Sequence, residues 1–337
     1  MALAGIIRAE IVEKQEATVM AGSGITVVMA TYDPPAHWLR EQLQSVAAQA
    51  LPPEKVLILD DCSPHTELED IRRILTETLG ELPWELTRNE ENQGSNETFA
   101  ALIQQVETPY VAFCDQDDRW MPHKLETLLG QMQDDRVTAV CSDQQIIDGE
   151  GKVLFDSITQ AMPHIHFRSG ENLAPGLLKD NFMSGCTMLM RTEIAKAALP
   201  LVPGMVYDHH LALFSAARGK VISLPEALIA HRIHGNNQTG PLGDIRTKAD
   251  YIAKRVEPFA RRMAALKDRI DLGQPQRTLE DWASARLDYS RRVKGAGKRL
   301  LRLRRCSQGV TLFELLLPLM PGCMFRFVLK ALQRGKI

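Results

Sequence analysis

The stretch that decides the fold is YVAFCDQDDRW, residues 110–120. It begins with four apolar residues, and a short apolar run of this kind predicts a buried strand. Three carboxylates, Asp115, Asp117 and Asp118, follow at once. In open α/β sheets, ligands bind outside the carboxyl ends of the strands. Carboxylates this close repel each other, so the stretch indicates either an exposed acidic turn or a site that holds Mg²⁺ or Mn²⁺ together with substrate phosphates.

The chain before this stretch alternates between strands and helices. Strands are expected at 25–30, 55–59 and 84–87, and helices at 36–50, 63–79 and up to 106. This alternation is typical of βαβ units with a parallel sheet and right-handed crossovers. Polar loops follow three strands, at 31–33, 60–63 and 115–118. We expect these loops to meet at one edge of the sheet and to form a polar crevice there.

The chain after the stretch continues in the same mixed manner. The expected elements are a helix at 122–132, a strand at 137–141, a hairpin of 144–147 with 152–155, a strand at 186–190, a helix from Asp208, and strands at 221–222 and 227–230. Neither a dinucleotide-binding glycine motif nor a P-loop occurs in the sequence. The predicted fold class is therefore α/β with a mostly parallel central sheet.

Charge divides the chain into two parts. Residues 241–337 carry 22 Lys and Arg against 9 Asp and Glu, a net charge of +13, whereas residues 1–240 carry 18 against 33, a net charge of −15. Hydrophobic residues make up 45% of the chain and charged residues 24%, as in ordinary globular proteins. We expect an N-terminal arm at 1–23, a globular domain at 24–240 and a basic, amphipathic helical region at 241–337.

The cysteines and the apolar runs indicate in which cellular compartment the protein is expected. None of the six cysteines has CxxC or zinc-site spacing, so free thiols in a reducing compartment are expected. The N-terminus lacks the apolar core of a signal peptide. Glu314, Pro318 and Pro321 interrupt the longest apolar stretch, residues 310–325, which argues against a transmembrane helix. We therefore expect a cytoplasmic protein.

Several motifs occur in an order that resembles a known family. They are TYD at 31–33, DDCS at 60–63, QGSN at 93–96, CDQDDRWMP at 114–122, SGCTMLMR at 184–191 and VYDHH at 206–210. As an ordered set they resemble the inverting family-2 glycosyltransferases of the GT-A fold, over residues 25–240. The ending HRIHGNNQTG, residues 231–240, is similar to the subgroup that contains bacterial rhamnosyltransferases. The tail after residue 245 lies outside the resemblance.

The resemblance implies a role for each matching residue. The general base would be Asp208, the metal ligands would be Asp117, Asp115 and His234, and the donor-binding residues would be Thr31, Tyr32, Asp33, Asp61, Asp115, Asp118, Gly185 and Arg232. Tyr32 would stack on the nucleotide base and Asp61 would hydrogen-bond its edge. The sequence has YDHH where many relatives have an acidic pair, and it lacks the QxxRW motif of processive synthases. A single transfer is therefore favoured over processive synthesis.

Each of these roles has a plainer alternative. Tyr32 could cap the end of a strand, and Asp61 could be an acid at a helix N-terminus, where the helix dipole favours it. Asp208 could be an N-cap. His231 and His234 could be ordinary surface histidines, although a pair beside a guanidinium could also serve a metal or a diphosphate.

The function implied is metal-dependent, inverting transfer of one sugar. The donor would be a nucleotide-diphosphate sugar, with dTDP-L-rhamnose the leading candidate, and the cofactor Mg²⁺ or Mn²⁺. The acceptor would be a hydroxyl of a lipid-linked or polysaccharide acceptor in cell-surface or cell-wall polysaccharide synthesis. One alternative is a non-catalytic binding protein that recruits partners through its basic tail. Nucleic acid is not an expected partner, because the tail lacks interleaved aromatics and a recognised motif.

The basic tail has the composition of a membrane-surface segment. Eight cations lie within residues 291–305, and an apolar run follows them. Cations near an anionic leaflet and buried apolar side chains both favour binding at the lipid interface. We therefore expect a peripheral protein at the inner face of the cell membrane. The alternative is a helix pair that packs on the catalytic domain or forms a dimer contact.

Overall fold

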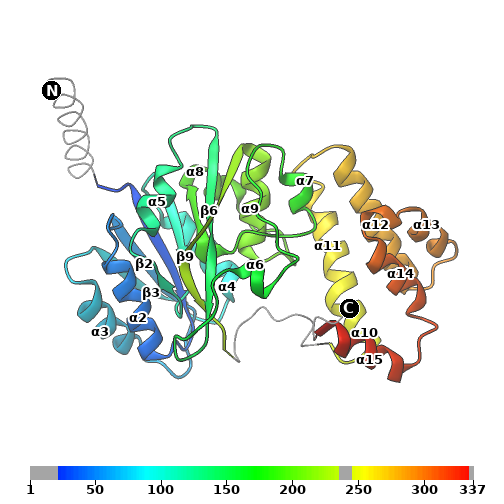
Figure 1. Ribbon diagram of the computed structural model, residues 1–337, viewed down its shortest axis with the longest axis horizontal. Helices are drawn as coiled ribbons and strands as arrows, with labels where there is room; N and C mark the ends of the chain where they lie inside the picture. Colours follow the sequence, from blue (N-terminus) through cyan, green and yellow to red (C-terminus); the bar gives the residue numbers. More distant parts are fainter. Residues whose placement is uncertain (1–21, 235–244, 334–337) are drawn as a thin grey trace. The chain divides into compact units, whose positions relative to one another are not determined.

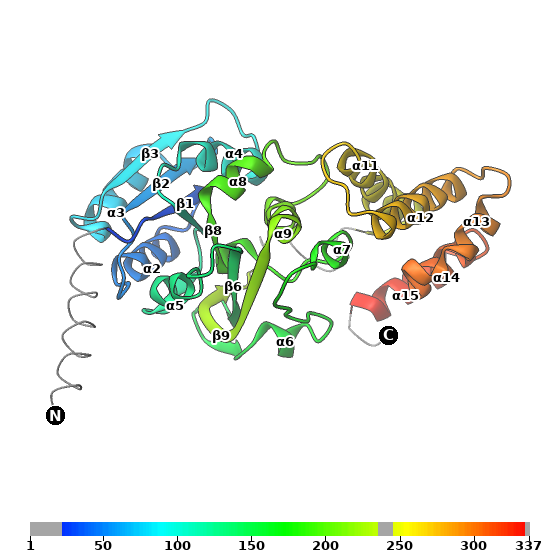
Figure 2. The ribbon, with the colours of Figure 1, turned by 90° about the horizontal axis from the view of Figure 1, so that it is seen from above.

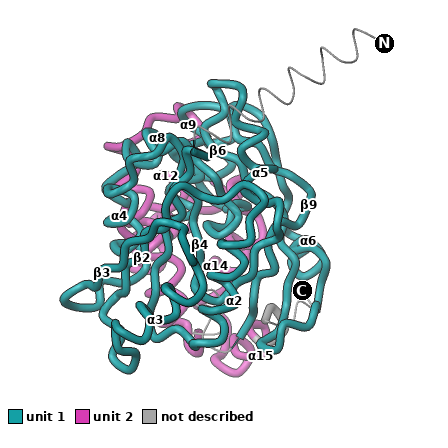
Figure 3. The backbone as a smooth tube through the Cα atoms, turned by 90° about the vertical axis from the view of Figure 1, so that its left-hand side faces the viewer, with its two compact units in different colours: residues 1–201, 206–234 teal, residues 202–205, 235–337 magenta. Residues whose placement is uncertain are grey.

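The computed structural model describes residues 22–234 and 245–333. The chain divides into two compact units (Figure 3). The first unit is Met1–Leu201 with Val206–His234, and the second is Val202–Met205 with Gly235–Ile337. Most of the predicted N-terminal arm, and residues 235–240 of the HRIHGNNQTG motif, lie outside the described residues.

The first half of the central sheet is parallel, as predicted (Figure 1). It consists of β3 (Trp84–Arg88), β2 (Lys55–Asp60), β1 (Ile25–Thr31) and β4 (Tyr110–Cys114), in that order. The strands β1, β2 and β4 are rich in buried apolar residues, which suit a sheet that is covered on both faces, whereas the edge strand β3 is partly exposed. In this register Thr31 lies beside Asp60, so the polar loops that follow β1 and β2 begin at the same level.

The second half of the sheet mixes directions. Its strands are β8 (Met188–Arg191), β6 (Val137–Ile147), β9 (Lys220–Arg232) and β5 (Arg119–Trp120), with β7 (Val153–Phe155) paired to β6. The longest pairing, between β6 and β9, is parallel, whereas β8, β5 and β7 add short antiparallel ladders. The sheet is therefore mostly parallel by extent.

Helices cover both faces of this sheet (Figure 2). They are α2 (Ala36–Ala47), α3 (Leu68–Leu79), α4 (Ser95–Gln105), α5 (Lys124–Gly130), α6 (Ile158–Ala161), α7 (Ala174–Leu177), α8 (Thr192–Ala198) and α9 (Tyr207–Arg218). Alternate strand residues supply the two cores, because successive strand side chains point to opposite faces. Met29 packs with the apolar faces of α2, α3 and α5 in one core, and Phe113 contacts Phe99 of α4 and Tyr207 of α9 in the other.

Several elements differ from the sequence-based expectation. The expected segments 137–141 and 144–147 form one strand, β6, and 221–222 and 227–230 form one strand, β9, because the two pair along nearly their whole length. Residues Gly185–Thr187 form a 3₁₀ turn, so the strand expected at 186–190 begins only at Met188. The short strand β5, directly after the acidic loop, was not anticipated.

The second unit is helical, as predicted. Its elements are α10 (Lys248–Tyr251), a π-helical turn (Ile252–Val256), α11 (Glu257–Leu266), α12 (Gln274–Ser290), α13 (Ala296–Arg302), α14 (Gln308–Leu316) and α15 (Gly322–Gln333). Its core joins Tyr251 and Val256 to Met320, Phe325 and Leu329. Within residues 22–234 and 245–333, no helix is long and apolar enough to cross a membrane.

A buried ion pair lies inside this helical unit. The guanidinium of Arg286 on α12 donates to both carboxylate oxygens of Glu314 on α14, at 2.6–3.0 Å. The Tyr251 hydroxyl donates to the same carboxylate at 2.9 Å, and the Arg286 guanidinium lies 4.4 Å from the ring centre of Trp282. Glu314, which the sequence shows only as an interruption of an apolar run, is therefore turned into the core of the unit.

Candidate active site

The acidic loop between β4 and β5 lies beside the end of β9. In the antiparallel pairing of β5 with β9, Arg119 is opposite Ala230. This pairing brings the segment 231–234 next to the loop that carries Asp117 and Asp118, although more than a hundred residues separate the two. Two chain segments therefore build one polar cluster at the end of the sheet.

Asp118 is the most deeply buried acid of the loop. Its Oδ1 accepts hydrogen bonds from His231 Nδ1 at 2.9 Å and from the Arg232 amide at 3.0 Å. Burial by itself raises the pKa of Asp118, but the charge and hydrogen bond of His231 outweigh burial and hold the pKa below its ordinary value. Burial opposes the charge on His231 as well, yet the facing carboxylates raise the His231 pKa to about 9. The two groups therefore form an ion pair.

The second oxygen of Asp118 has no hydrogen bond of ordinary geometry in the described part of the chain. The thiol of Cys186 lies beside the Asp118 carboxylate and lowers the Asp118 pKa further. The ligand atoms of Asp115, Asp118, Cys186 and His231 all lie within 4.8 Å of one another. A buried carboxylate oxygen without a donor indicates that this cluster is short of positive charge.

Asp115 and Asp117 show the same shortage of positive charge. Burial, together with the carboxylates of Asp118 and Asp117, raises the pKa of Asp115 to about 7. Burial and Asp118 also raise the pKa of Asp117, although its Oδ2 lies 2.7 Å from His234 Nε2. A set of carboxylates and imidazoles fits a divalent cation such as Mn²⁺ or Mg²⁺, with the single thiol a softer addition.

Arg232 connects the acidic loop to the neighbouring segments through hydrogen bonds and an ion pair. Its Nε donates to the Asp117 carbonyl at 2.8 Å, and its NH1 donates to the carbonyls of Asp148 and Gly149 at 3.2 Å. Its NH2 pairs with Glu41 of α2. The guanidinium is buried and fully engaged with protein atoms, so it fixes the acidic loop between α2 and the 148–152 turn.

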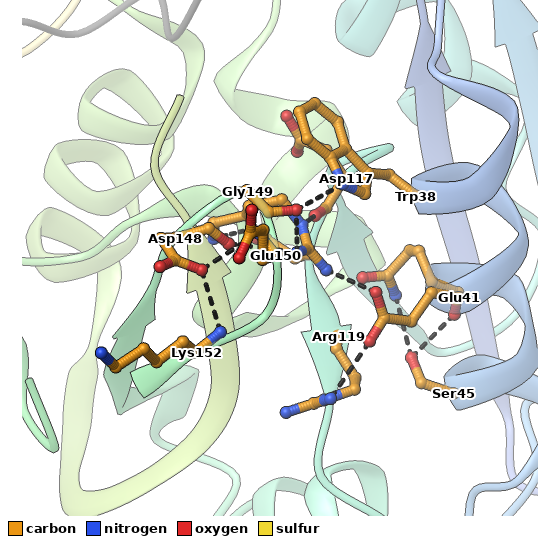
Figure 4. Close-up of polar contacts among 12 residues, drawn as sticks. Trp38, Glu41, Ser45, Asp117, Arg119, Asp148, Gly149, Glu150 and Lys152 are labelled. Carbon is orange, nitrogen blue, oxygen red and sulfur yellow. Dashed lines mark hydrogen bonds and ion pairs between the residues drawn. The ribbon is translucent and has the colours of Figure 1, made fainter. Parts of the chain in front are cut away.

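Helix α2 supplies the other half of this support (Figure 4). Glu41 also pairs with Arg119 at 3.1 Å, and the Trp38 indole donates to the Gly149 carbonyl at 3.0 Å. The Trp38 ring lies 4.9 Å from that of His234. The sequence pattern gave no reason to select Trp38 or Glu41, because both lie in an ordinary amphipathic helix.

The loop after β1 is bound to the acidic loop by one side chain. The Gln116 amide accepts from the Tyr32 N–H at 2.8 Å and donates to the Tyr32 carbonyl at 3.1 Å. Tyr32 is 47% exposed, so its side chain remains accessible at this edge of the sheet. Gln116 lies inside the motif but was not selected, since only its acidic neighbours suggested chemistry.

The remaining residues of the first loops are bound mainly to one another. Thr31 Oγ1 donates to Asp60 at 3.1 Å. Asp33, at a φ of 41°, accepts from the His65 N–H at 2.9 Å and donates its own N–H to Ser63. These contacts hold the two loops together at the carboxyl end of β1 and β2.

Asp61 organises the loop that precedes α4. Its Oδ1 accepts from the Gln93 N–H and from Asn89, and its Oδ2 accepts from the Gly94 N–H, all at 2.8 Å. Asp61 is therefore not an acid of the helix that follows it in sequence, α3. It instead fixes the turn that begins α4, and it places the QGSN motif beside the DDCS motif.

Asp208 lies in the first turn of α9, where it is not the N-cap, because that position belongs to Val206. Its carboxylate accepts from the His209 N–H at 2.5 Å and from the Gly185 N–H at 3.3 Å. Burial raises the pKa of Asp208 to about 6, against the lowering effect of these two hydrogen bonds. It also lies close enough to Asp115 to raise the pKa of that residue.

Gly185 has a steric reason to be glycine. A Cβ at this position would lie 2.0 Å from the Tyr207 hydroxyl, far inside van der Waals contact. Tyr207 is buried and stacks on Phe99 with ring centres 4.0 Å apart. The bare backbone at Gly185 is therefore required by Tyr207, which in turn sets the start of α9 and the position of Asp208.

The predicted residues thus fall into three groups. Asp115, Asp117, Asp118, His234 and Arg232 meet around the acidic loop. Asp208 and Gly185 lie together at the start of α9, within electrostatic reach of Asp115. Thr31, Tyr32, Asp33 and Asp61 lie on the loops that follow β1 and β2.

Comparison with known sequences points to one family. The family described as Glycosyl transferase family 2 matches residues 26–198, just over half of the chain. An uncharacterized glycosyltransferase of Nostoc is 28% identical over 221 residues, which are 63% of this chain and 66% of that protein. An uncharacterized protein of Mycobacterium tuberculosis is 25% identical over 63% of this chain. The match spans less than two thirds of the length of these relatives.

Comparison with solved structures agrees on the fold. A mannosyltransferase from Pyrobaculum calidifontis, in complex with GDP-Man and Mn²⁺, has a TM-score of 0.53 at 16% identity and covers 86% of this chain and 75% of its own. Staphylococcus aureus TarS residues 1–349, in complex with UDP, has a TM-score of 0.55 at 14% identity and covers 92% and 91%. At such identities the likeness shows the GT-A-like fold alone.

Proposed function

This chain belongs to glycosyl transferase family 2, and from that premise we propose that it transfers one sugar from a nucleoside-diphosphate donor to an acceptor hydroxyl with inversion. The chain is a glycosyltransferase. One observation carries the finer proposal: the Asp208 carboxylate on α9 accepts a hydrogen bond from the Gly185 amide, and the thiol of the next residue, Cys186, lies within 4.8 Å of the ligand atoms of Asp115 and Asp118. A base and a candidate cation site at one place are what a direct displacement requires.

Asp208 is assigned as the general base. Its pKa of about 6 leaves it ionised at neutral pH yet basic enough to accept the proton of a sugar hydroxyl as that hydroxyl attacks. The His209 and Gly185 amides orient its carboxylate. Attack from the side opposite the leaving diphosphate inverts the anomeric carbon without a covalent enzyme intermediate.

The cation is assigned to the acidic loop. Asp117 and Asp115, with His234, would hold Mn²⁺ or Mg²⁺, and the ion would neutralise the charge that develops on the leaving diphosphate. Arg232 and the Oδ1 atom of Asp118 hold the loop in place, through bonds to the Asp117, Asp148 and Gly149 carbonyls and to His231. We therefore assign Arg232 a positioning role in donor binding. The second oxygen of Asp118 would be available to the same cation. The Mn²⁺ bound by the Pyrobaculum mannosyltransferase supports this choice of metal.

The donor is assigned to the loops after β1 and β2. The exposed ring of Tyr32 would stack on the nucleotide base, and Asp61 would shape the pocket for its edge. Thr31 and Asp33 hold these loops, and the Gly185 turn borders the sugar. GDP-Man, bound by the Pyrobaculum mannosyltransferase, and UDP, bound by TarS, support a nucleotide sugar. From the HRIHGNNQTG ending we propose dTDP-L-rhamnose as the first donor to test.

The acceptor is proposed to be a hydroxyl of a lipid-linked or polysaccharide acceptor, and the second unit to provide a peripheral membrane contact. Leu319, between α14 and α15, is 82% exposed, and Phe327 on α15 is 72% exposed, whereas Phe325 on α15 is 1% exposed. Residues 291–305 of the same unit carry exposed cations as well. On this proposal, residues 24–240 form the catalytic domain and residues 241–337 the membrane-binding region, at the inner face of the cell membrane.

A donor screen tests the chemistry. Purified protein with Mn²⁺ is offered dTDP-L-rhamnose, UDP-GlcNAc and GDP-mannose, and release of the nucleoside diphosphate is measured with and without acceptor. The variant Asp208→Asn should lose at least ~10²-fold in transfer and keep its donor affinity, because it retains shape but not basicity. Unchanged transfer in that variant would remove Asp208 from the mechanism, and a preference for a UDP-hexose would refute the rhamnose assignment.

Flotation with liposomes tests the membrane contact. The full chain should float with vesicles that contain about 30% phosphatidylserine, because basic and apolar segments bind at such interfaces. High salt should weaken this binding, since it screens the charges. Phe327→Glu with Leu319→Glu should abolish flotation, whereas Val153→Glu, at an exposed apolar site of the first unit, should not. Protein that stays unbound at low salt would show that this surface serves another purpose.

A further inference from the structure

A fully buried lysine lies behind the acidic cluster, and the proposed mechanism does not use it. Lys124 is the first residue of α5 and is 0% exposed. Its Nζ donates a hydrogen bond to the Cys186 carbonyl at 2.5 Å and lies 3.4 Å from the ring centre of Trp120. A lysine has three N–H donors and is costly to bury, so its retention in a core calls for a specific use.

The carbonyl that Lys124 binds belongs to the 3₁₀ turn Gly185–Thr187. The amide before it, Gly185 N–H, is the group that donates to Asp208 Oδ2. The same turn packs against Tyr207, the residue that precedes Asp208 on α9. Two hydrogen bonds, one at each side of the turn, therefore connect Lys124 to the carboxylate assigned as the base.

We propose that Lys124 is a positioning residue that holds the 185–187 turn where the Gly185 amide orients the Asp208 carboxylate toward the acceptor. The inference rests on the proposed function, in which Asp208 is the base. A neutral donor could bind the Cys186 carbonyl, but the ammonium group of Lys124 also carries a positive charge. That charge faces the acids of the neighbouring loop. Its charge reaches Asp115 and Asp118.

The turn has a second anchor that is independent of this cation. Thr187 Oγ1 donates to the Ser184 carbonyl at 2.7 Å and closes the turn from its other end. Loosening either anchor should let the Gly185 amide move relative to Asp208. A displacement of about 1 Å in a group that orients the chemistry can lower the rate by about 10²-fold. The expected effect therefore falls on kcat and leaves the binding of donor unchanged.

The decisive experiment compares Lys124→Met with Leu128→Ala in the full chain. Methionine keeps the length and the apolar body of lysine but removes the hydrogen bond and the charge. Lys124→Met should lower kcat by about 10–10²-fold at saturating Mn²⁺ and donor, with donor KM and Mn²⁺ half-saturation within about twofold of the parent. Leu128→Ala removes a buried apolar side chain of the same helix and keeps the hydrogen bonds of Lys124 to Cys186 and of Gly185 to Asp208, so it should lower Tm and leave kcat intact.

Two further variants separate the possible failures. Thr187→Val loosens the same turn without removing the cation, and it should reproduce the loss of kcat even if Lys124→Met does not fold. Asp208→Asn is measured in parallel. If Asp208→Asn is inactive while Lys124→Met and Thr187→Val keep the parent kcat, the positioning role is refuted and the base remains. If Asp208→Asn is fully active, the proposed function itself fails. A rise in Mn²⁺ half-saturation alone would assign Lys124 to the metal loop instead and would also refute the inference.

Discussion

Each unit contains a polar cluster in which carboxylates are removed from water: one carboxylate in the helical unit and three at the end of the sheet. The two clusters differ in whether protein groups satisfy those carboxylates. In the helical unit, the Glu314 carboxylate accepts from Arg286 and from Tyr251, so that both of its oxygens are bound. At the end of the sheet, Asp115, Asp117 and Asp118 crowd together, and one oxygen of Asp118 has no hydrogen bond within the described residues. The first cluster is complete with protein atoms alone, whereas the second is not.

The difference has a physical consequence. A buried carboxylate that is fully paired stabilises one arrangement of helices and offers nothing to a ligand, since its lone pairs are occupied. A cluster of carboxylates with raised pKa values stores repulsion that a cation relieves when it binds. The comparison shows why the acidic loop, and not the more ionic core of the second unit, is the candidate active site.

The largest expected effect, and the strongest test of the difference between the two clusters, is the loss of transfer when the metal site is removed. Asp117→Asn and EDTA should each reduce transfer to background, because both remove the charge match at the leaving diphosphate. The fold should persist, and Tm of Asp117→Asn should equal or exceed that of the parent, since the substitution removes one of three repelling charges. Activity assays with added Mn²⁺ and thermal unfolding measure both. Full turnover in metal-free buffer would contradict the assignment.

The matching substitution in the other cluster should act in the opposite way. Glu314→Gln leaves the Arg286 guanidinium buried without its counter-ion, which should destabilise the fold by about 3–5 kcal/mol. The double variant Arg286→Met with Glu314→Leu removes both charges and should recover most of that loss. Denaturant unfolding gives the free energies. A Glu314→Gln protein as stable as the parent would show that the two clusters do not differ in the way described.

The pH dependence gives a smaller effect with a definite sign. Burial raises the pKa of Asp208 to about 6, so its base form is lost as pH falls, and kcat should drop about tenfold per pH unit below about 6. Because this pKa is higher in the folded than in the unfolded chain, ionised Asp208 destabilises the fold above about pH 6, and the penalty vanishes below about pH 4. Asp208→Asn should therefore raise Tm at pH 8 and have little effect on Tm at pH 4. The same Tm change at both pH values would argue against the burial of that charge.

The smallest expected effect sharpens the distinction between fold and site. Tyr32 is largely exposed, so Tyr32→Ala should leave Tm within about 1 °C of the parent, as surface substitutions usually do. It should raise donor KM by about 5–10-fold, which corresponds to the free energy of one aromatic stacking contact. Tyr32→Phe keeps the ring and serves as the control with normal KM. Equal KM values for all three proteins would exclude stacking on the base.

The sequence alone reached much of this arrangement. The alternation of apolar runs and helices predicted the parallel half of the sheet, and the polar residues after β1, β2 and β4 were correctly placed at one edge. These inferences succeed because they use local patterns: a buried strand is recognised from its own residues, and parallel strands end on the same side. The order of motifs also selected the residues of the acidic loop and Asp208.

Long-range contacts were beyond such patterns. Nothing near Asp118 in sequence indicates that His231 and the Arg232 amide bind it, or that Glu41 lies behind Arg232, because these contacts form only after β5 pairs with β9. The sequence around Lys124 does not distinguish it from an ordinary helical lysine. Its burial depends on the Trp120 ring and on the turn at Cys186, which the sheet brings to it.

Glu314 shows the same limit in the second unit. In sequence it interrupts an apolar run and suggests a polar side, yet in the structure it is buried while Leu316 and Leu319 are exposed. When most positions of a helix are apolar, its own pattern does not fix which face turns inward, and the partner Arg286 on another helix decides it. The sequence therefore determined the elements and the chemistry they carry, and the tertiary structure decided which charges are satisfied by the protein and which are left for a ligand.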